Sequence, residues 1–169
     1  MLTASIITST LLAALVGGVF FAFSAFVMRA LDERPAAQGI AAMQRINLAV
    51  ITPLFLGAFL GTAPLLGAAA WIARAAGCSD AFALLGFSFV VYAVGSVVVT
   101  MLFNVPRNGR LAALDPDSPE AAAYWPAYVR EWLLWNHVRC IASVAAAALA
   151  AFALAASGVK CSAIRPGPI

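Results

Sequence analysis

Residues 81–106 read AFALLGFSFVVYAVGSVVVTMLFNVP, a run that contains no Asp, Glu, Lys or Arg. A transmembrane helix needs about 20 mainly apolar residues to cross the hydrocarbon core of a bilayer, and this run is long enough. Lipid offers the backbone no hydrogen-bond partners, so a spanning segment is either a helix or part of a closed barrel. The run lacks strand-like alternation and far exceeds the length of a strand. It therefore predicts a transmembrane helix.

Three further uncharged runs of similar length cover residues 2–28, 46–73 and 140–159. Together the four runs predict an all-α integral membrane protein, an antiparallel four-helix bundle whose partner is the lipid bilayer. Residues 1–159 are expected to form a single transmembrane domain. Residues 160–169 end in Pro-Gly-Pro-Ile and are expected to form a flexible C-terminal tail.

The few charged residues are distributed unevenly between the two ends of the bundle. Seven arginines lie between runs one and two or between runs three and four: Arg29, Arg34, Arg45, Arg107, Arg110, Arg130 and Arg139. The other side holds Arg74, Lys160 and Arg165. The positive-inside rule then places both termini outside and the arginine-rich connections in the cytoplasm. The net charge of +3 belongs to these connections, so no nucleic acid is expected as a partner.

Metal and redox motifs are missing from the sequence. The chain has one histidine, and its three cysteines show no CxxC spacing, so we expect neither a metal nor a cofactor. The uncharged runs contain no carboxylate for a proton relay of the kind that pumps use. Cys78 and Cys161 share the outer face under this topology, and a disulfide between them stays open.

Glycines and prolines predict the local geometry of the spans. Gly57 and Gly61 form a GxxxG pattern that favours a close helix contact, and Gly17 belongs to a similar small-residue seam on the first span. The oligomeric state, including a homo-oligomer, stays open. Pro53 and Pro64 are expected to kink the second span.

The segment between the third and fourth runs carries clear helix-boundary signals. Pro106 disfavours helix at the residue before it, so the third span is expected to end at residues 103–106. Asp117 is expected to cap a new helix, with Pro119 in its first turn. The helical pattern then continues through an aromatic stretch into the last run. It predicts an extended amphipathic N-terminal part on helix 4.

Polar side chains gather at the arginine-rich ends of the runs: Gln44, Asn47, Asn104, Arg107, Asn108, Asn136, His137 and Arg139. Amide and guanidinium groups at this depth are costly unless they are hydrogen-bonded or face a cavity. Two accounts stay open. The arginines reach lipid phosphates while the asparagines cap helix ends, or the groups converge as a pocket. We favour the pocket, because three separate helix ends contribute amides.

Three of these stretches, MQRIN at 43–47, FNVPRN at 103–108 and WNHVR at 135–139, resemble a small four-span bacterial family labelled DUF1772, as does GVFFAFS at 18–24. That family is related to fungal anthrone oxygenases, and the similarity runs through Ala156. The resemblance implies a four-helix fold in the bacterial inner membrane. It also implies an oxidoreductase that adds O₂ to a lipophilic, anthrone-like aromatic without metal or flavin. Whether this chain is an enzyme stays open.

A mechanism for such an oxygenase can be assigned to the polar residues as a hypothesis. His137 is the side chain whose ordinary proton affinity suits a base near neutral pH. Arg139, Asn104 and Asn108 are expected to hold the enolate oxygen. The rings of Phe103 and Trp135 are expected to stack on the substrate. Further substrate-binding candidates are Ser24, Gln44, Asn47, Arg107 and Asn136.

Two other functions fit the same sequence. A protein that binds or transports a small lipophilic molecule would use the same pocket without chemistry. A structural or assembly subunit would instead have an occluded bundle interior with no pocket.

Overall fold

The computed structural model describes residues 1–160, and the described part is almost entirely helical. In chain order the elements are α1 (Leu2–Ala22), η1 (Phe23–Val27), α2 (Met28–Asp32), α3 (Ala36–Ala49), α4 (Pro53–Ala75), α5 (Ser79–Tyr92), η2 (Ala93–Val98), η3 (Thr100–Asn104), α6 (Val105–Ala112) and α7 (Pro119–Lys160). The η elements are π-helical turns inside longer helices. This arrangement confirms the predicted all-α class.

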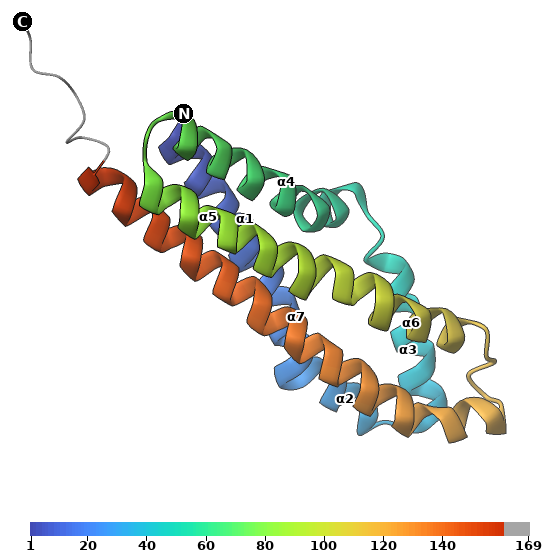
Figure 1. The fold of residues 1–169 in the computed structure, drawn as a ribbon. Coiled ribbons are helices and arrows are strands. Elements are labelled where there is room, and N and C mark those ends of the chain that lie inside the picture. Colours follow the sequence, from blue (N-terminus) through green and yellow to red (C-terminus); the bar gives the residue numbers. More distant parts are fainter. Residues whose placement is uncertain (161–169) are drawn as a thin grey trace, which may run out of the picture.

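Four of the resulting helical stretches are long and apolar enough to cross a membrane: Leu2–Asp32, Pro53–Ala75, Ser79–Ala112 and Pro119–Gly158. Successive spans run in opposite directions, and the N-terminus, the α4–α5 connection and the end of α7 lie at one end of the bundle (Figure 1). The antiparallel four-helix bundle is therefore confirmed. The fourth span belongs to α7, which is one continuous helix. As predicted, α7 begins well before the uncharged run at residues 140–159.

Small side chains and buried hydroxyls hold the spans together. Ala146 and Ala150 of α7 are fully buried, which lets α1 and α5 approach its backbone closely. The Ser88 hydroxyl donates to the Ala146 carbonyl at 2.8 Å, and the Tyr92 hydroxyl donates to the Phe59 carbonyl at 2.9 Å. These bonds satisfy hydroxyl groups that would otherwise be unpaired in the bundle interior.

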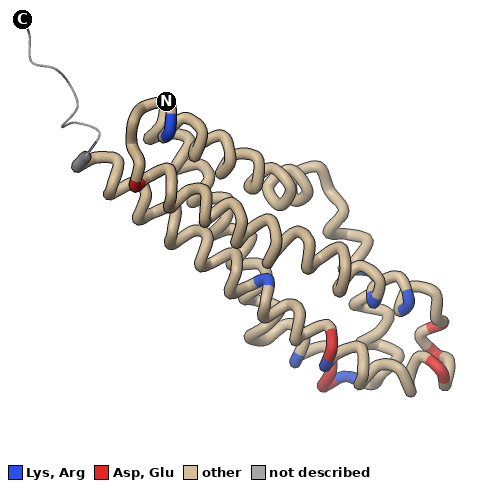
Figure 2. Tube along the Cα trace, in the orientation of Figure 1, with Lys and Arg blue, Asp and Glu red and all other residues tan. Residues whose placement is uncertain are grey.

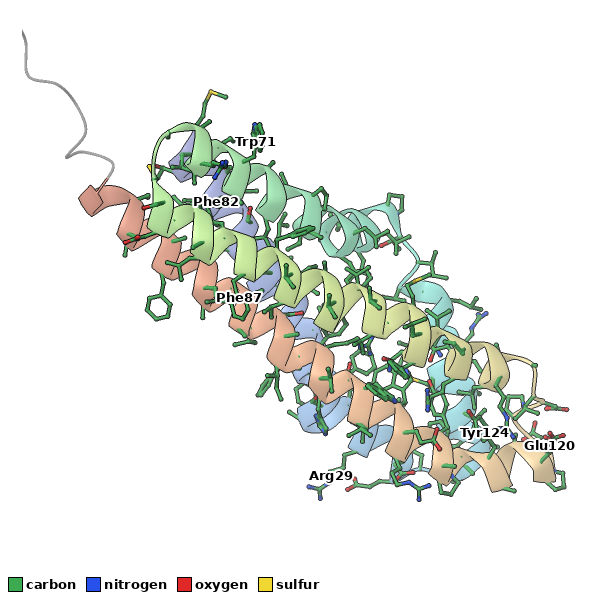
Figure 3. The ribbon with its side chains drawn as sticks, viewed as in Figure 1. Arg29, Trp71, Phe82, Phe87, Glu120 and Tyr124 are labelled. Atoms are coloured by element: carbon green, nitrogen blue, oxygen red, sulfur yellow. The ribbon has the colours of Figure 1, made fainter. Side chains whose placement is uncertain are left out.

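Large apolar side chains project outward from the spans. Trp71 and Phe87, both labelled in Figure 3, are among the exposed large hydrophobic residues. A soluble bundle would bury such side chains, whereas a membrane protein presents them to lipid. Charged residues gather instead at the end formed by α2, α3, α6 and the first part of α7 (Figure 2). Both features fit a protein embedded in a bilayer.

The second span begins at Pro53, later than the predicted residue 46, because α3 and α4 are separate helices. The Thr52 hydroxyl caps α4 by accepting from the Phe55 backbone N–H at 3.2 Å. Pro53 then occupies the first helical turn, where a missing N–H leaves no bond unmade. The prediction that Pro53 kinks the span was wrong for this reason. Pro64 does lie inside α4.

The third span does not end at residues 103–106 as predicted but continues to Ala112. The backbone N–H of Val105 bonds to the Thr100 carbonyl, five residues earlier, so the helix is π-like just before Pro106. A wider turn at this point accommodates a residue that cannot donate the usual bond. The helix therefore continues through Pro106, where it was predicted to end.

The cap of α7 is Ser118 and not Asp117 as predicted. The Ser118 hydroxyl accepts from the Ala121 N–H at 3.1 Å, while the Asp117 N–H donates to the Asp115 carboxylate. The predicted position was wrong by one residue because both side chains are good caps. Pro119 is the first residue of α7, as expected.

The close helix contacts predicted at glycines were confirmed in the first span and not in the second. A Cβ at Gly17 would lie 3.2 Å from Val144, so the predicted close contact of the first span is confirmed. Nothing in the described part of the chain lies within 4 Å of a Cβ built at Gly57 or Gly61, so the predicted contact there was wrong within one chain. Cys161 and most of the predicted tail lie outside the described residues. Whether Cys161 pairs with Cys78 stays open.

Candidate functional site

A cavity of about 470 Å³ lies at the arginine-rich end of the bundle, between three walls. The end of α1 with η1 forms one wall, α3 and α4 form the second, and η3 with α6 forms the third, while Trp132 and Arg139 of α7 close the back. Its volume falls in the range of small-molecule sites. The lining is mostly apolar: Val19, Phe20, Phe23, Met43, Ile46, Leu48, Val50, Ile51, Phe55, Leu56, Phe59, Leu60, Met101, Val105, Gly109 and Ala112.

Four polar side chains interrupt this apolar wall: Asn47, Thr100, Asn108 and Arg139. Thr100 and Asn108 come from the third span, Arg139 from the fourth, and Asn47 from α3. An apolar chamber with a few convergent polar groups is the usual composition of a site that orients a lipophilic ligand. A structural or assembly subunit was expected to have an occluded interior with no pocket, and this cavity does not fit that expectation.

Arg139 is the charged group of this chamber. Arg139 is buried, with only 5% of the residue exposed. Nη2 donates to the side-chain amide oxygen Oδ1 of Asn136 at 2.7 Å, and Nη1 donates to the Thr100 hydroxyl at 3.2 Å. The guanidinium carbon lies 4.4 Å from the ring centre of Phe20 and 5.1 Å from that of Trp132. Packing and neutral acceptors hold the cation in place.

No carboxylate balances this cation within residues 1–160. The ion pairs there join Arg29 to Glu33 and Arg107 to Glu131. The Nε of Arg139 is buried and has no acceptor. A buried charge normally has an ionic partner, because its desolvation is costly. Arg139 is therefore available to an anionic group that enters the cavity.

A chain of hydrogen bonds runs from Arg139 to the outer surface of the bundle. The Asn136 amide nitrogen donates to the Phe20 carbonyl and to the Ser24 hydroxyl, both at 2.8 Å. The Ser24 oxygen in turn lies 2.9 Å from Nδ1 of His137. Ser24 lies in the π turn η1. The wider backbone pairing of a π turn leaves a carbonyl group open to a hydrogen bond from a side chain. The chain fixes the orientation of Asn136 and hence of Arg139.

Two asparagines on the facing walls have different environments. The Asn108 carbonyl oxygen accepts from the Tyr128 hydroxyl and from Nε1 of Trp132, both at 2.9 Å. Those two donors fix the amide orientation. The Asn47 amide nitrogen is buried and makes no hydrogen bond of ordinary geometry within residues 1–160, although the Tyr128 hydroxyl lies near enough to interact with it. An unpaired buried donor costs about 1–3 kcal/mol, so an oxygen atom of a ligand or water would be favoured there.

A family model described as Anthrone oxygenase matches residues 50–149, more than half of the 169 residues. The chain belongs to the anthrone oxygenase family. The matched region includes Thr100, Asn108, Trp132 and Arg139 of the cavity, while Ser24 and Asn47 lie before it. No curated protein and no solved structure gives a significant match.

Among the predicted site residues of this family member, Arg139, Asn108 and Asn47 line the cavity, and Asn136 and Ser24 support Arg139 from behind. The side chain of Asn104 is fully buried, donates to the Trp132 carbonyl at 3.2 Å and does not line the cavity. Its carbonyl oxygen has no partner. The structure therefore gives no support to its predicted place at the enolate oxygen.

His137 is exposed and does not line the cavity. A direct base must reach the proton that it removes, and the base role of His137 stays a prediction. The reason for its exposure is helical: His137 follows Asn136 directly, and adjacent residues on a helix face different directions. One faces the bundle interior, and the other faces outward.

The two rings predicted to stack on a substrate stack on each other instead. Phe103 and Trp135 have ring centres 3.5 Å apart with an angle of 7° between their planes, and neither lines the cavity. Gln44 donates to the carbonyls of Leu111 and Leu114, which joins α3 to the end of α6. None of these three side chains is in a position to touch a molecule in the cavity.

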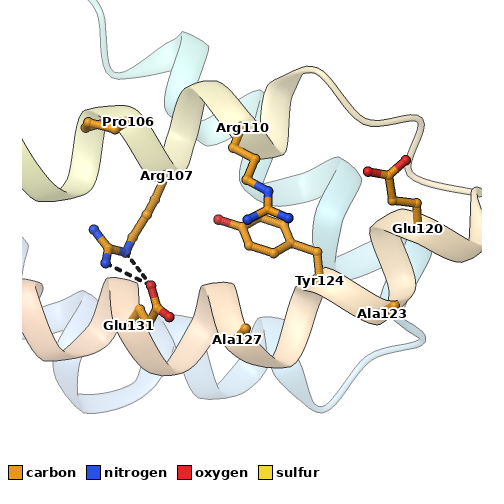
Figure 4. A pocket seen from close by; sticks show the side chains of 8 residues that line it. All are labelled: Pro106, Arg107, Arg110, Glu120, Ala123, Tyr124, Ala127 and Glu131. Carbon is orange, nitrogen blue, oxygen red and sulfur yellow. Dashed lines mark hydrogen bonds and ion pairs between the residues drawn. The ribbon is translucent and has the colours of Figure 1, made fainter.

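Arg107 belongs to a second hollow, shown in Figure 4. This hollow has a volume of about 560 Å³ between α6 and the start of α7, and charged groups line much of it. Arg107 pairs with Glu131 at 2.8 Å, and the Arg110 guanidinium carbon lies 4.1 Å from the ring centre of Tyr124. Its cations are already neutralised or stacked, so it lacks the unpaired charge of the apolar cavity.

Three residues of the site were not predicted from the sequence: Phe20, Thr100 and Trp132. Phe20 looks like an ordinary core aromatic, and its approach to Arg139 depends on how α1 crosses α7. Trp132 lies seven residues before Arg139 on α7, so their shared helix face was a usable signal. No motif indicates that the Thr100 hydroxyl faces the cavity. Among residues 1–160, no group of three or more His, Cys, Asp or Glu is placed to hold a metal ion.

Proposed function

We propose that this membrane protein is a cofactor-independent oxygenase that binds a lipophilic, anthrone-like aromatic in the apolar cavity, with its ionised oxygen on Arg139. The observation that carries the proposal is a buried guanidinium without an acidic partner, facing a chamber of otherwise apolar side chains. Family membership supplies the reaction class. The binding site supplies a reason for the substrate to ionise.

The chemistry needs an anion before it needs oxygen. An anthrone has an acidic CH₂ group opposite its carbonyl, and loss of one proton to water gives an enolate. A fixed positive charge in a chamber of low dielectric constant stabilises that enolate strongly. Arg139 is held in advance by Asn136, Thr100 and the Phe20 ring, so little reorganisation is required when the charge forms.

The enolate carbon then passes electrons to O₂ and forms a carbon-bound peroxide anion. This anion takes up one proton from water, equivalent to the proton released at the start, and becomes a hydroperoxide. Loss of hydroxide from the hydroperoxide, with the remaining hydrogen of the former CH₂ carbon leaving as a proton, gives the quinone. The hydroxide and that proton combine as water, so anthrone and O₂ become the quinone and water. O₂ is apolar and dissolves in an apolar chamber, which brings both reactants to one place. Asn47 and Asn108 are proposed to face the polar substituents of the ring system.

His137 is proposed as a positioning residue for Arg139, acting through Ser24 and Asn136. Its imidazole lies at the outer end of the hydrogen-bonded chain, so its contribution is orientation of the amide. No proton is assigned to it.

The test is oxygen uptake by purified protein in lipid nanodiscs with anthrone as substrate. We expect one O₂ consumed per quinone formed, and loss of turnover in Arg139→Gln by at least about a hundredfold, the size typical for removal of one oxyanion-stabilising group. Arg110→Gln is the matched control, because it removes a cation from the other hollow. Equal activity of Arg139→Gln and wild type would overturn the proposal. Saturable binding without oxygen uptake would favour the binding-protein reading.

We also infer that the arginine-rich end faces the cytoplasm and that both termini lie outside, in a bacterial inner membrane. That end is formed by α2, α3 and α6 with their connections, which hold Arg29, Arg34, Arg45, Arg107 and Arg110, while Arg74 lies in the last turn of α4 at the opposite end. The positive-inside rule supports this orientation. Labelling of single cysteines introduced at Arg34 or Arg74 by an impermeant reagent in intact cells would test it.

A further inference from the structure

The cavity has a rim of exposed apolar side chains on one side. Leu48 and Ile51, at the end of α3 and in the α3–α4 connection, are 64% and 63% exposed. Met101 and Val105, on η3 and α6, are 56% and 45% exposed. All four side chains line the cavity while also facing out of the bundle. The chamber is therefore open between α3–α4 and the third span.

This rim lies on the uncharged part of the chain. Leu48 and Ile51 belong to the uncharged run 46–73, and Met101 and Val105 belong to the run 81–106. Large apolar side chains around an opening to water would be costly, whereas hydrocarbon covers them favourably. Toward the charged end the cavity wall contains two small residues, Gly109 and Ala112. The apolar side of the opening thus matches lipid.

The backbone at the rim is suited to contact with lipid. The connection at residues 50–52 is irregular, and irregular backbone is tolerated at membrane depth only where its polar groups are satisfied. The N–H groups of Val50, Ile51 and Thr52 donate to the carbonyls of Ile46, Leu48 and Val50 at 2.9, 3.1 and 2.8 Å. The α3–α4 break can therefore border an opening to hydrocarbon without unpaired donors.

Polar groups lie deeper than this rim. Arg139, with 5% exposure, closes the back of the chamber together with Trp132, and its unpaired Nε is buried. A molecule arriving from the rim meets apolar side chains first and the cation last. That order suits an apolar ring system with one acidic oxygen at its leading edge.

We propose that the cavity opens sideways into the bilayer between α3–α4 and η3–α6, and that the lipophilic substrate enters from the hydrocarbon with its acidic oxygen directed toward Arg139. This inference rests on the proposed function for the identity of the ligand. It adds the route and the class of molecule, one that partitions into membranes before it binds.

The test separates the two sides of the opening with bulky substitutions. Met101→Trp and Leu48→Trp narrow the apolar rim, Ala112→Trp narrows the side near the charged end, and Val94→Trp adds the same bulk at an exposed position outside the cavity. Anthrone binding to protein in liposomes is followed without oxygen by stopped-flow quenching of tryptophan fluorescence. Without oxygen no turnover occurs, so binding is measured separately from chemistry.

We expect the two rim variants to slow the association rate roughly tenfold or more, within the range over which association rates vary among variants of one site. Val94→Trp should remain within about twofold of wild type, and Ala112→Trp should slow association less than either rim variant does. Slow association in Ala112→Trp with normal rates in both rim variants would overturn the lateral route. Met101→Ala, which removes bulk from an exposed side chain, should bind at least as fast as wild type; slower association there would also contradict the route.

The outcomes for entry and for function are distinguishable. If wild type binds anthrone through the rim but consumes no O₂ when air is admitted, the oxygenase proposal fails and the lateral route stands. If wild type consumes O₂ and no rim variant changes association or kcat/KM, the route fails and the oxygenase proposal stands.

Discussion

The Nη2 atom of Arg139 donates to the side-chain oxygen Oδ1 of Asn136 at 2.7 Å, and this neutral side-chain amide occupies the place where buried arginines usually have a carboxylate. The pair is three residues apart on α7, so one helical turn holds both groups in register. The consequence is a guanidinium that is fixed in position and keeps its charge for a ligand.

Replacement of Asn136 by Asp should neutralise Arg139 from within. The new carboxylate would lie where the amide oxygen now accepts, and it would compete with any anionic ligand. Asn136→Ala is the matched control, because both variants lose the donor bonds to Phe20 and Ser24. We expect anthrone affinity to fall further in Asn136→Asp than in Asn136→Ala, as measured by anaerobic titration. Equal affinities in the two variants would argue against an electrostatic role for Arg139.

Replacement of His137 by Gln distinguishes a base from a positioning residue. A direct base would lose nearly all turnover, typically by a factor of about 10²–10⁴. The exposed position of His137 and its bond to Ser24 predict a smaller loss, below about tenfold, which Gln partly preserves because its amide can still bond to the hydroxyl. Steady-state oxygen uptake measures the difference. A loss of the larger size, with normal anthrone binding, would restore His137 as the base.

Gly95 and Gly86 offer a matched test of the packing between the third and fourth spans. A Cβ at Gly95 would lie 2.5 Å from the Ala142 Cβ, whereas a Cβ at Gly86 has no neighbour within 4 Å. We therefore expect Gly95→Ala to destabilise the protein by about 1–3 kcal/mol through overpacking. Gly86→Ala should be close to neutral. Thermal unfolding in detergent measures both, and equal melting temperatures would show that α5–η2 and α7 do not pack this closely.

The four uncharged runs were enough to predict a four-helix membrane fold. Hydrocarbon excludes charges over the length of a span, and few other structures require so long a stretch without charged residues. The helix boundaries predicted at the ends of these runs were wrong. The residues next to a proline determine whether the helix begins, ends or continues there. Pro53 begins a helix because Thr52 caps it, and Pro106 stays inside a helix because a π turn precedes it. Both outcomes depend on local backbone pairing, which residue types alone do not determine.

The candidate site could be predicted in composition but only partly in geometry. Arg139 and Asn136 share a helix face, so their proximity follows from spacing. His137 lies next to Asn136 in sequence and faces away from the chamber, and no motif indicates which of the two faces inward. The mutual stacking of Phe103 and Trp135 likewise depends on how the third and fourth spans cross. Side-chain direction across helices required the three-dimensional structure.

The most direct measurement of the central claim is the ionisation of bound anthrone without oxygen. Protein in nanodiscs is titrated with pH, and the absorption band of the enolate reports the ionised fraction of the bound ligand. The pH midpoint for wild type should lie below that of Arg139→Gln by about 1–3 units, the effect expected of one nearby opposite charge. Arg110→Gln should match wild type. An unchanged midpoint in Arg139→Gln, with the ligand still bound, would contradict the assignment of Arg139 as the group that stabilises the enolate.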